Sequence, residues 1–181
     1  IRALKWFKGN LKVVEQFNSA ESQAELLCPI LQDVDSDGEI EMVYFTEDHW
    51  EILKRSQDGI FEKTGEIEQG TRVPQLAYPF TLNEKKGFYS LCSSGIDVIG
   101  KSGMRMGCSL KVHSRYLTDL PQIVLGGVDW GDFDHDGVHD LVCMDGRKNV
   151  LEFLSYSAAT KSWQSVLHFQ VFEKDLHYRG K

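Results

Sequence analysis

Short apolar runs separated by polar turns dominate the hydrophobic pattern of this chain. The runs are rich in Val, Ile, Leu, Phe and Tyr, and Gly, Asp and Ser are frequent between them. No stretch has the spacing of apolar positions that marks an amphipathic helix. Runs of β-branched and aromatic residues bounded by turn residues are typical of strands. The pattern therefore predicts an all-β chain.

The predicted strands recur in units of similar length. Gly38, Gly87 and Gly137 are 49 and 50 residues apart. Around each glycine the order is the same: a strand, a turn that carries the glycine, a second strand, and then a hairpin that adds two more strands. The predicted strands are 26–31, 40–45, 50–55 and 60–63 in the first unit, 75–82, 88–92, 95–99 and 108–112 in the second, and 122–128, 140–144, 150–155 and 164–172 in the third.

Four antiparallel strands repeated about every 40–50 residues are typical of a β-propeller blade. A β-sandwich is the alternative, but the matched glycines favour the propeller. Ala3-Leu4-Lys5 also matches Ile52-Leu53-Lys54 at an offset of 49, which suggests the outer strands of a preceding unit. We therefore expect an incomplete blade in 1–20, blades in 21–69, 70–119 and 120–173, and a tail in 174–181.

The number of repeated units indicates how the expected propeller would close. The chain holds about three and a half units, whereas propellers typically have about four to eight blades. We therefore expect a β-propeller segment of about three and a half four-stranded antiparallel blades. It would form part of a larger propeller, closed by sequence outside this chain or by a partner.

Two acidic turns carry the candidate chemistry. Each sets acidic side chains at positions 1, 3, 5 and 9 and a glycine at position 6, with apolar runs on both sides. Crowded carboxylates repel one another unless a cation lies between them, and hard oxygen ligands in this alternation suit Ca²⁺. The residue at position 7 would add its backbone carbonyl. The expected ligands are Asp33, Asp35, Asp37, Glu39 and Glu41 in the first turn, and Asp132, Asp134, Asp136, Val138 and Asp140 in the second.

The turns are not EF-hands. Position 12, where an EF-hand has glutamate, is Tyr44 in one turn and Cys143 in the other, and the flanking runs indicate strands. The alternative to a cation site is a solvated acidic hairpin turn, because Asp and Gly are common turn residues.

The sequence 131–142, Gly-Asp-Phe-Asp-His-Asp-Gly-Val-His-Asp-Leu-Val, closely resembles the FG-GAP repeat of integrin α-subunit propellers and related proteins. The sequence 32–43 is similar, but has Glu41 where the family usually has Asp. The resemblance implies a propeller whose Ca²⁺ loops join the first two strands of a blade. It also implies a rigid platform for protein–protein contact, in adhesion receptors or intracellular scaffolds, while some bacterial relatives bind sugars.

The middle unit departs from this pattern. It has Lys85 and Lys86 beside Gly87 where the other units have acids, so we expect no cation there. Either a lysine ammonium replaces the metal and pairs with Glu84, or the segment is a plain polar turn.

Composition and the distribution of charge argue against nucleic-acid binding and against a membrane-spanning helix. The chain has 181 residues, a net charge of −7 and 41% hydrophobic residues, which suffices for a core. Its basic residues form no stripe of the kind that nucleic-acid binding needs, and no apolar run is long enough for a membrane helix. The default for cysteines beside apolar runs is a free buried thiol, although disulfides stay open; these are Cys28, Cys92, Cys108 and Cys143. The compartment stays open as well.

Signatures of catalysis are missing from the sequence. It has no Gly-x-Ser-x-Gly elbow, no glycine-rich phosphate loop and no paired cysteine motif. His135 and His139 occupy positions of the acidic turn that should point away from the cation. The tryptophans fit packing between blades better than a sugar site; they are Trp6, Trp50, Trp130 and Trp163.

We therefore expect a non-enzymatic, calcium-stabilised scaffold whose partner is a protein, in adhesion or in a complex. The alternatives are a carbohydrate-binding lectin and the non-catalytic propeller part of a larger enzyme. Because function concentrates on loops held by a rigid scaffold, the contact surface is expected on the connections 70–73, 102–107, 115–120 and 155–161.

Overall fold

The computed structural model describes residues 2–16, 27–68, 72–82, 85–102, 110–145 and 147–171. Every regular element within these ranges is a β-strand, and the fourteen strands form three four-stranded antiparallel sheets and one two-stranded hairpin. The all-β prediction is confirmed. Within the described ranges there is accordingly no helix that could cross a membrane.

Each four-stranded sheet is a meander of consecutive strands, which is the topology of a propeller blade. The hairpin consists of β1 (Arg2–Phe7) and β2 (Asn10–Gln16). The first sheet contains β3 (Leu27–Gln32), β4 (Glu41–Phe45), β5 (His49–Arg55) and β6 (Phe61–Glu68). The second contains β7 (Pro74–Leu82), β8 (Lys85–Cys92), β9 (Gly95–Lys101) and β10 (Leu110–Leu117). The third contains β11 (Gly127–Gly131), β12 (Asp140–Asp145), β13 (Val150–Ser157) and β14 (Ser162–Gln170).

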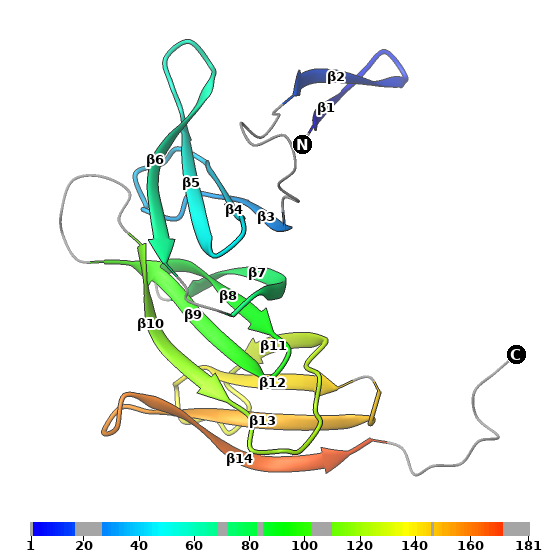
Figure 1. The fold of residues 1–181 in the computed structure, drawn as a ribbon, viewed down its shortest axis with the longest axis vertical. Helices are drawn as coiled ribbons and strands as arrows, with labels where there is room; N and C mark the ends of the chain where they lie inside the picture. The colour runs from blue at the N-terminus through cyan, green and yellow to red at the C-terminus, as the bar shows by residue number, and fades with distance from the viewer. Residues whose placement is uncertain are drawn as a thin grey trace, which may run out of the picture.

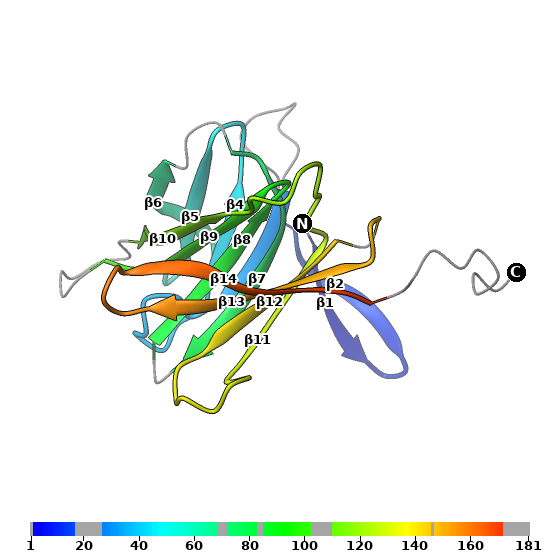
Figure 2. The ribbon, with the colours of Figure 1, turned by 90° about the horizontal axis from the view of Figure 1, so that it is seen from below.

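The three sheets are stacked in sequence order along the long axis of the molecule (Figure 1). The first strand of the first sheet, β3, lies against the first strand of the second, β7. The last strand of the second sheet, β10, contacts both β6 and β14. Viewed from below, the sheets overlap one behind another (Figure 2). Successive sheets therefore pack face to face, as neighbouring blades do.

Two of the three hydrophobic clusters lie between sheets, and the third, of Met42, Tyr44 and Leu53, belongs to the first sheet alone. One cluster joins the first and second sheets, where the indole ring of Trp50 packs edge-on against Phe88 with centroids 4.8 Å apart. A second cluster joins the second and third sheets, where Tyr89 lies 5.4 Å from Trp130. Trp50 is fully buried, and each such side chain contributes roughly 1.5–3 kcal/mol by leaving water. Trp50 and Trp130 are thus packing residues between sheets, as the sequence suggested.

The first strand of the third sheet begins later than predicted. Residues 122–126 are not a strand, because their backbone bonds elsewhere: the Val124 amide donates to the Asp145 carboxylate at 3.0 Å, and the Leu125 amide to the Ser93 carbonyl at 3.1 Å. Ile123 and Leu125 are nevertheless buried in the second core cluster. Their apolar character reflects packing rather than strand pairing.

Gly87 also has a different role from the one its spacing suggested. It lies inside β8, paired with Phe80 on β7 and Gly100 on β9, and not in a turn. A Cβ atom at this position would lie 2.3 Å from the Ile99 carbonyl oxygen and 2.9 Å from the Phe80 ring. Gly87 therefore permits close strand packing, whereas Gly38 and Gly137 have the positive φ that sharp turns require.

The hairpin β1–β2 matches the two adjacent strands expected near the N-terminus. Among the described strands it pairs only with itself. Several of its apolar side chains are more than half exposed, namely Leu4, Trp6, Leu11, Val13 and Val14. Its membership of a blade stays a prediction, as do the limits of the expected blades and the closure of the propeller.

The cysteines that the structure describes fit the default of free thiols. Cys92 and Cys143 are buried and form no disulfide with a described residue, and burial raises the pKa of both thiols. The side chain of Cys28 and all of Cys108 lie outside the described part of the chain.

Candidate metal centres

Both acidic turns join the first and second strands of a sheet. The first connects β3 to β4 and the second connects β11 to β12. Their backbones match at two positions: φ is 61° at Ser36 and 62° at His135, and 93° at Gly38 and 83° at Gly137. The repeated sequence pattern therefore folds into the same turn twice.

The carboxylates of each turn accept hydrogen bonds from the turn's own backbone. In the second turn the Gly137 amide donates to Asp132 Oδ2 at 3.1 Å, the Val138 amide to Asp136 Oδ1 at 2.7 Å, and the Phe133 amide to Asp140 Oδ2 at 3.1 Å. The first turn repeats these bonds at Asp33, Asp37 and Glu41, at 3.1, 2.9 and 2.9 Å. In the first turn both oxygens of Asp33 accept such bonds, from the Asp37 and Gly38 amides. In the second turn one oxygen of Asp132 and one of Asp140 stabilise the turn, and the other oxygen of each is left for a different partner.

In the second turn these remaining oxygens lack a partner among the described residues. Asp132 Oδ1 and Asp140 Oδ1 are buried and accept no hydrogen bond. One carboxylate oxygen each from Asp132, Asp134 and Asp136 lies within 4.8 Å of the others. No described Lys, Arg or His forms an ion pair with these acids. Each buried oxygen without a partner costs about 1–3 kcal/mol, and a bound cation removes that cost. The donor set consists of hard oxygens and fits Ca²⁺.

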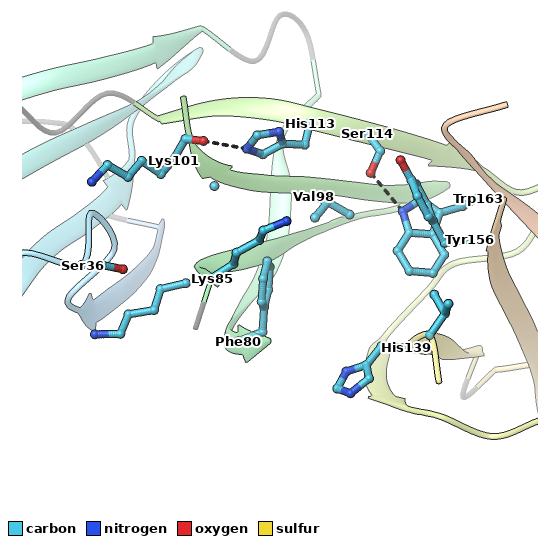
Figure 3. Close-up of a pocket in the computed structure, with 13 residues that line it drawn as sticks. Ser36, Phe80, Lys85, Val98, Lys101, His113, Ser114, His139, Tyr156 and Trp163 are labelled. Carbon is cyan, nitrogen blue, oxygen red and sulfur yellow. Dashed lines mark hydrogen bonds between the residues drawn. The ribbon is translucent and has the colours of Figure 1, made fainter. Parts of the chain in front are cut away.

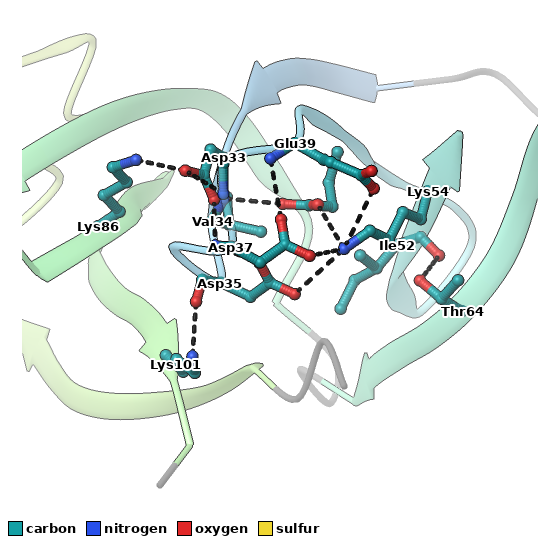
Figure 4. Close-up of polar contacts among 12 residues, drawn as sticks. Asp33, Val34, Asp35, Asp37, Glu39, Ile52, Lys54, Thr64, Lys86 and Lys101 are labelled. Atoms are coloured by element: carbon teal, nitrogen blue, oxygen red, sulfur yellow. Dashed lines mark hydrogen bonds and ion pairs between the residues drawn. The ribbon is translucent and has the colours of Figure 1, made fainter. Parts of the chain in front are cut away.

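In the first turn lysine side chains offset part of the acidic charge, and Glu41 Oε1 is buried without a hydrogen bond. The ammonium of Lys54, on β5, forms an ion pair with Asp37 and lies 3.8 Å from Asp35 Oδ2 and 3.7 Å from Glu41 Oε1 (Figure 4). It also lies 3.6 Å from Glu39 Oε2, so Glu39 offers its side chain and not only the expected carbonyl. A carboxylate cluster of Asp33, Asp35 and Glu41 could still hold a metal. A divalent cation here would compete with Lys54.

The pKa values of Glu41 and Asp33, at the two ends of the first turn, are shifted in opposite directions. Glu41 is fully buried, and this burial, with the neighbouring charges of Asp35 and Asp33, raises its pKa to about 7. Burial acts in the same direction on Asp33, but the hydrogen bonds from Lys86 and the Gly38 amide outweigh it and lower the pKa of Asp33.

The second sheet supplies two of the lysines that contact the first turn. Lys86 Nζ lies 2.5 Å from Asp33 Oδ2, and Lys101 Nζ donates to the Asp35 carbonyl oxygen at 2.6 Å (Figure 4). The partner of Lys86 is therefore an acid of the neighbouring unit. The expected alternative, Glu84, lies outside the described residues. The first turn is thus a polar link between the first and second sheets.

The histidines of the second turn lie outside the carboxylate cluster. His135 is exposed, and His139 is half-buried with a buried Nδ1 atom that has no hydrogen-bond partner among the described residues. The two groups of described residues that could hold a metal consist of carboxylates only. Val138 is exposed, so its carbonyl is positioned by the turn rather than by packing.

A further acid recurs at the same position of each four-stranded sheet, and the sequence patterns did not identify it. Glu51, Asp97 and Glu152 each occupy the third position of the third strand in their sheet, and each is paired. Tyr44 donates to Glu51 at 2.5 Å and Tyr116 to Glu152 at 2.5 Å. The sequence does contain a sign of these residues, because each is an acid within an otherwise apolar run.

Asp97, the second of these acids, is fully buried and accepts bonds from two arginines. Arg72 Nη1 lies 2.6 Å and Arg115 Nε 2.7 Å from its Oδ1 atom. Within the expected contact segment 115–120, Arg115 and the buried Tyr116 are therefore committed to internal contacts. Leu117 is 56% exposed. The expected contact residues 70, 71 and 103–107 lie outside the described part of the chain.

One cluster has the composition of a catalytic triad but not its geometry. Ser165 Oγ lies 2.8 Å and Glu152 Oε1 3.0 Å from the same atom, His168 Nε2. A triad needs the serine and the acid on opposite ring nitrogens, because the base receives a proton at one while the acid orients the other. This arrangement therefore offers no relay to the serine.

Comparisons with known proteins add no assignment: no family model matches the chain, and no curated protein matches it either.

Proposed function

We propose that this chain is a calcium-stabilised β-propeller segment that acts without catalysis as a scaffold for protein–protein interaction. The observation that carries the calcium part is the pair of buried oxygens without a partner, Asp132 Oδ1 and Asp140 Oδ1, in the second turn. They lie in one turn with the clustered carboxylates of Asp134 and Asp136.

The donor set favours Ca²⁺ over Mg²⁺. Ca²⁺ takes about six to eight oxygen ligands in flexible geometry, whereas Mg²⁺ keeps several waters and demands an octahedral site. In the second turn, Asp132, Asp134, Asp136 and Asp140 would supply carboxylate oxygens and Val138 its carbonyl. We assign the stronger site to this turn because in the first one a cation would have to compete with the Lys54 ammonium for the carboxylates.

When bound, the cation would supply positive charge to the link between β11 and β12. The chain's own residues then fix that link: the amide of Phe133 donates to Asp140, and its ring packs edge-on against Phe153 with centroids 5.9 Å apart. A stiffened second turn holds the first strands of the third sheet in register. The acidic turns are thus structural braces in this proposal.

The scaffold part rests on the arrangement of the sheets. Three sheets packed through buried clusters hold their connecting segments in fixed positions, and such segments are where binding concentrates. The resemblance of 131–142 to FG-GAP repeats supports the same role, because that family uses its propellers as contact platforms.

Thermal unfolding of the folded chain tests the calcium part. A cation that binds only the folded state stabilises it by about 2.7 kcal/mol at a hundredfold excess over Kd. EGTA should therefore lower the melting temperature, and Ca²⁺ should restore it better than an equal concentration of Mg²⁺. A melting curve that EGTA leaves unchanged would sink the calcium assignment.

A further inference from the structure

A cleft of about 510 Å³ extends from the first acidic turn to the third sheet. Ser36 of the first turn lies at one end, and His139 of the second turn, Tyr156 and Trp163 lie at the other (Figure 3). The second sheet forms the middle. The volume falls within the range of about 300–1,000 Å³ that small ligands and short segments occupy.

Three lysines line the cleft although the chain as a whole is acidic. Lys85, Lys86, Lys101, His113 and His139 line it, and no Asp or Glu is among its lining residues. The whole chain has a net charge of −7. A concave surface of one sign attracts ligands of the opposite sign. The cleft therefore favours an anionic ligand.

Lys85 is a charged side chain of the cleft that remains available to such a ligand. The ammonium groups of Lys86 and Lys101 are bonded to the first turn. Lys85 is exposed and has no ion pair with a described residue. An anion beside Lys85 would gain a charge-assisted hydrogen bond.

The other wall is apolar and fixed in position. Trp163 donates its indole N–H to Ser114 Oγ at 3.0 Å, and its ring lies 5.2 Å from that of Tyr156 (Figure 3). Phe80 and Val98 extend this wall. The cleft can thus bind an anionic group and a flat or aliphatic group at the same time.

Sugar recognition fits this lining poorly. Sugar hydroxyls need acceptors as well as donors, and side-chain carboxylates and amides are the strongest acceptors. None of the lining residues is Asp, Glu, Asn or Gln. Lysine donates only. The donor-rich lining instead matches a carboxylate, which accepts only.

We propose that this cleft binds an acidic segment of a protein partner, with a carboxylate at Lys85 and a neighbouring apolar side chain against Trp163 and Tyr156. This inference rests on the scaffold part of the proposed function and names the chemistry of its partner. It does not depend on the calcium part.

Binding of defined peptides to the full chain tests the proposal. The probes are a labelled hexapeptide of alternating Glu and Phe, the same peptide with Gln in place of Glu, and a short oligouronate. Binding is measured by fluorescence anisotropy at constant Ca²⁺ and physiological salt. The Glu peptide should bind at least about tenfold more tightly than the Gln peptide, and more tightly than the oligouronate.

A matched pair of variants locates the site. Lys85→Glu reverses a charge in the cleft, whereas Lys111→Glu reverses an exposed charge on β10 that does not line it. Lys85→Glu should weaken Glu-peptide binding about fivefold or more, and Lys111→Glu less than about twofold. Tyr156→Ala should weaken binding of the Glu peptide as well, because it removes part of the apolar wall. Equal melting temperatures of the two lysine variants show that both are folded.

Several results would overturn the cleft assignment: equal binding of the Glu and Gln peptides, tighter binding of the oligouronate, equal losses in the two lysine variants, or no peptide binding. Melting in EGTA separates this outcome from the calcium proposal. A chain whose melting responds to EGTA but which binds no acidic peptide refutes the cleft alone. One that binds the peptide without any response to EGTA refutes calcium alone.

Discussion

Lys86 of the second sheet forms an ion pair with Asp33 of the first acidic turn, with 2.5 Å between Nζ and Oδ2. Both side chains are partly shielded from water, with 29% and 13% of their surface exposed. The pair joins the unit that lacks an acidic turn to a unit that has one. The acidic turn therefore contributes to the contact between sheets as well as to its own hairpin.

Replacement of Lys86 tests this link. Lys86→Met should lower the free energy of unfolding by about 1 kcal/mol, because it leaves Asp33 without its charged partner. Lys85→Met is the matched control, since the neighbouring lysine has no ion pair with a described residue. Urea unfolding in EGTA measures both. A loss in Lys85→Met as large as that in Lys86→Met would mean that the pair is not specific.

Replacement of Lys54 should have a larger effect on stability, because its ammonium lies among the carboxylates of the first turn. Lys54→Met should destabilise the calcium-free chain by roughly 1–3 kcal/mol, since it leaves buried like charges facing one another. Added Ca²⁺ should then restore stability, because the emptied position suits a cation. Lys63→Met, which loses pairs to Glu51 and Glu66 at 2.9 Å, is the control in the same sheet.

Calorimetric titration checks the second half of that prediction. The Lys54→Met chain should take up one more Ca²⁺ than the unaltered chain, and the Lys63→Met chain should not. An unchanged stoichiometry in Lys54→Met would show that the lysine does not occupy a cation position.

The sequence predicted those features that depend on local spacing. The carboxylates and glycine of each acidic turn lie within nine residues, so their pattern specified the same backbone and the same hydrogen bonds in both turns. The four-stranded sheets followed from the alternation of apolar runs and turns. The limits of β11 did not, because Ile123 and Leu125 are apolar for packing between sheets.

The lysines that contact the first turn could not be found in this way. Lys54, Lys86 and Lys101 reach the first turn from three different strands, up to 66 residues away along the chain. Only the register and stacking of the sheets bring them there. Gly87 was predicted to lie in a turn because its spacing matches that of the turn glycines. It lies inside β8 instead, where the close approach of neighbouring strands requires glycine.

The pH dependence of stability should report on His49. Asp48 Oδ1 lies 2.7 Å from its Nδ1 atom and, with Glu51, raises the pKa of His49 above its ordinary value of 6.5. A raised pKa means that this contribution to stability is fully present below pH 6.5 and is lost as pH rises through the higher pKa of the folded state. Urea unfolding in EGTA at pH 6 and pH 8.5 measures the change.

The control for this prediction is His49→Gln, which cannot titrate. The difference in stability between the two pH values should be smaller in the variant, with less stability lost on going to pH 8.5. If the variant shows the same or a larger loss, another group governs stability in this range.

Calcium uptake by loop variants is the most direct test of the account. Asp136→Asn and Asp37→Asn remove one charge at the same position of the second and the first turn, and melting in EGTA establishes that both are folded. We predict that the unaltered chain binds Ca²⁺ in a calorimetric titration, that Asp136→Asn weakens the tightest site by about tenfold or more, and that Asp37→Asn leaves it within about twofold. An unaltered chain that takes up no Ca²⁺, or a tightest site that Asp37→Asn abolishes and Asp136→Asn preserves, would contradict it.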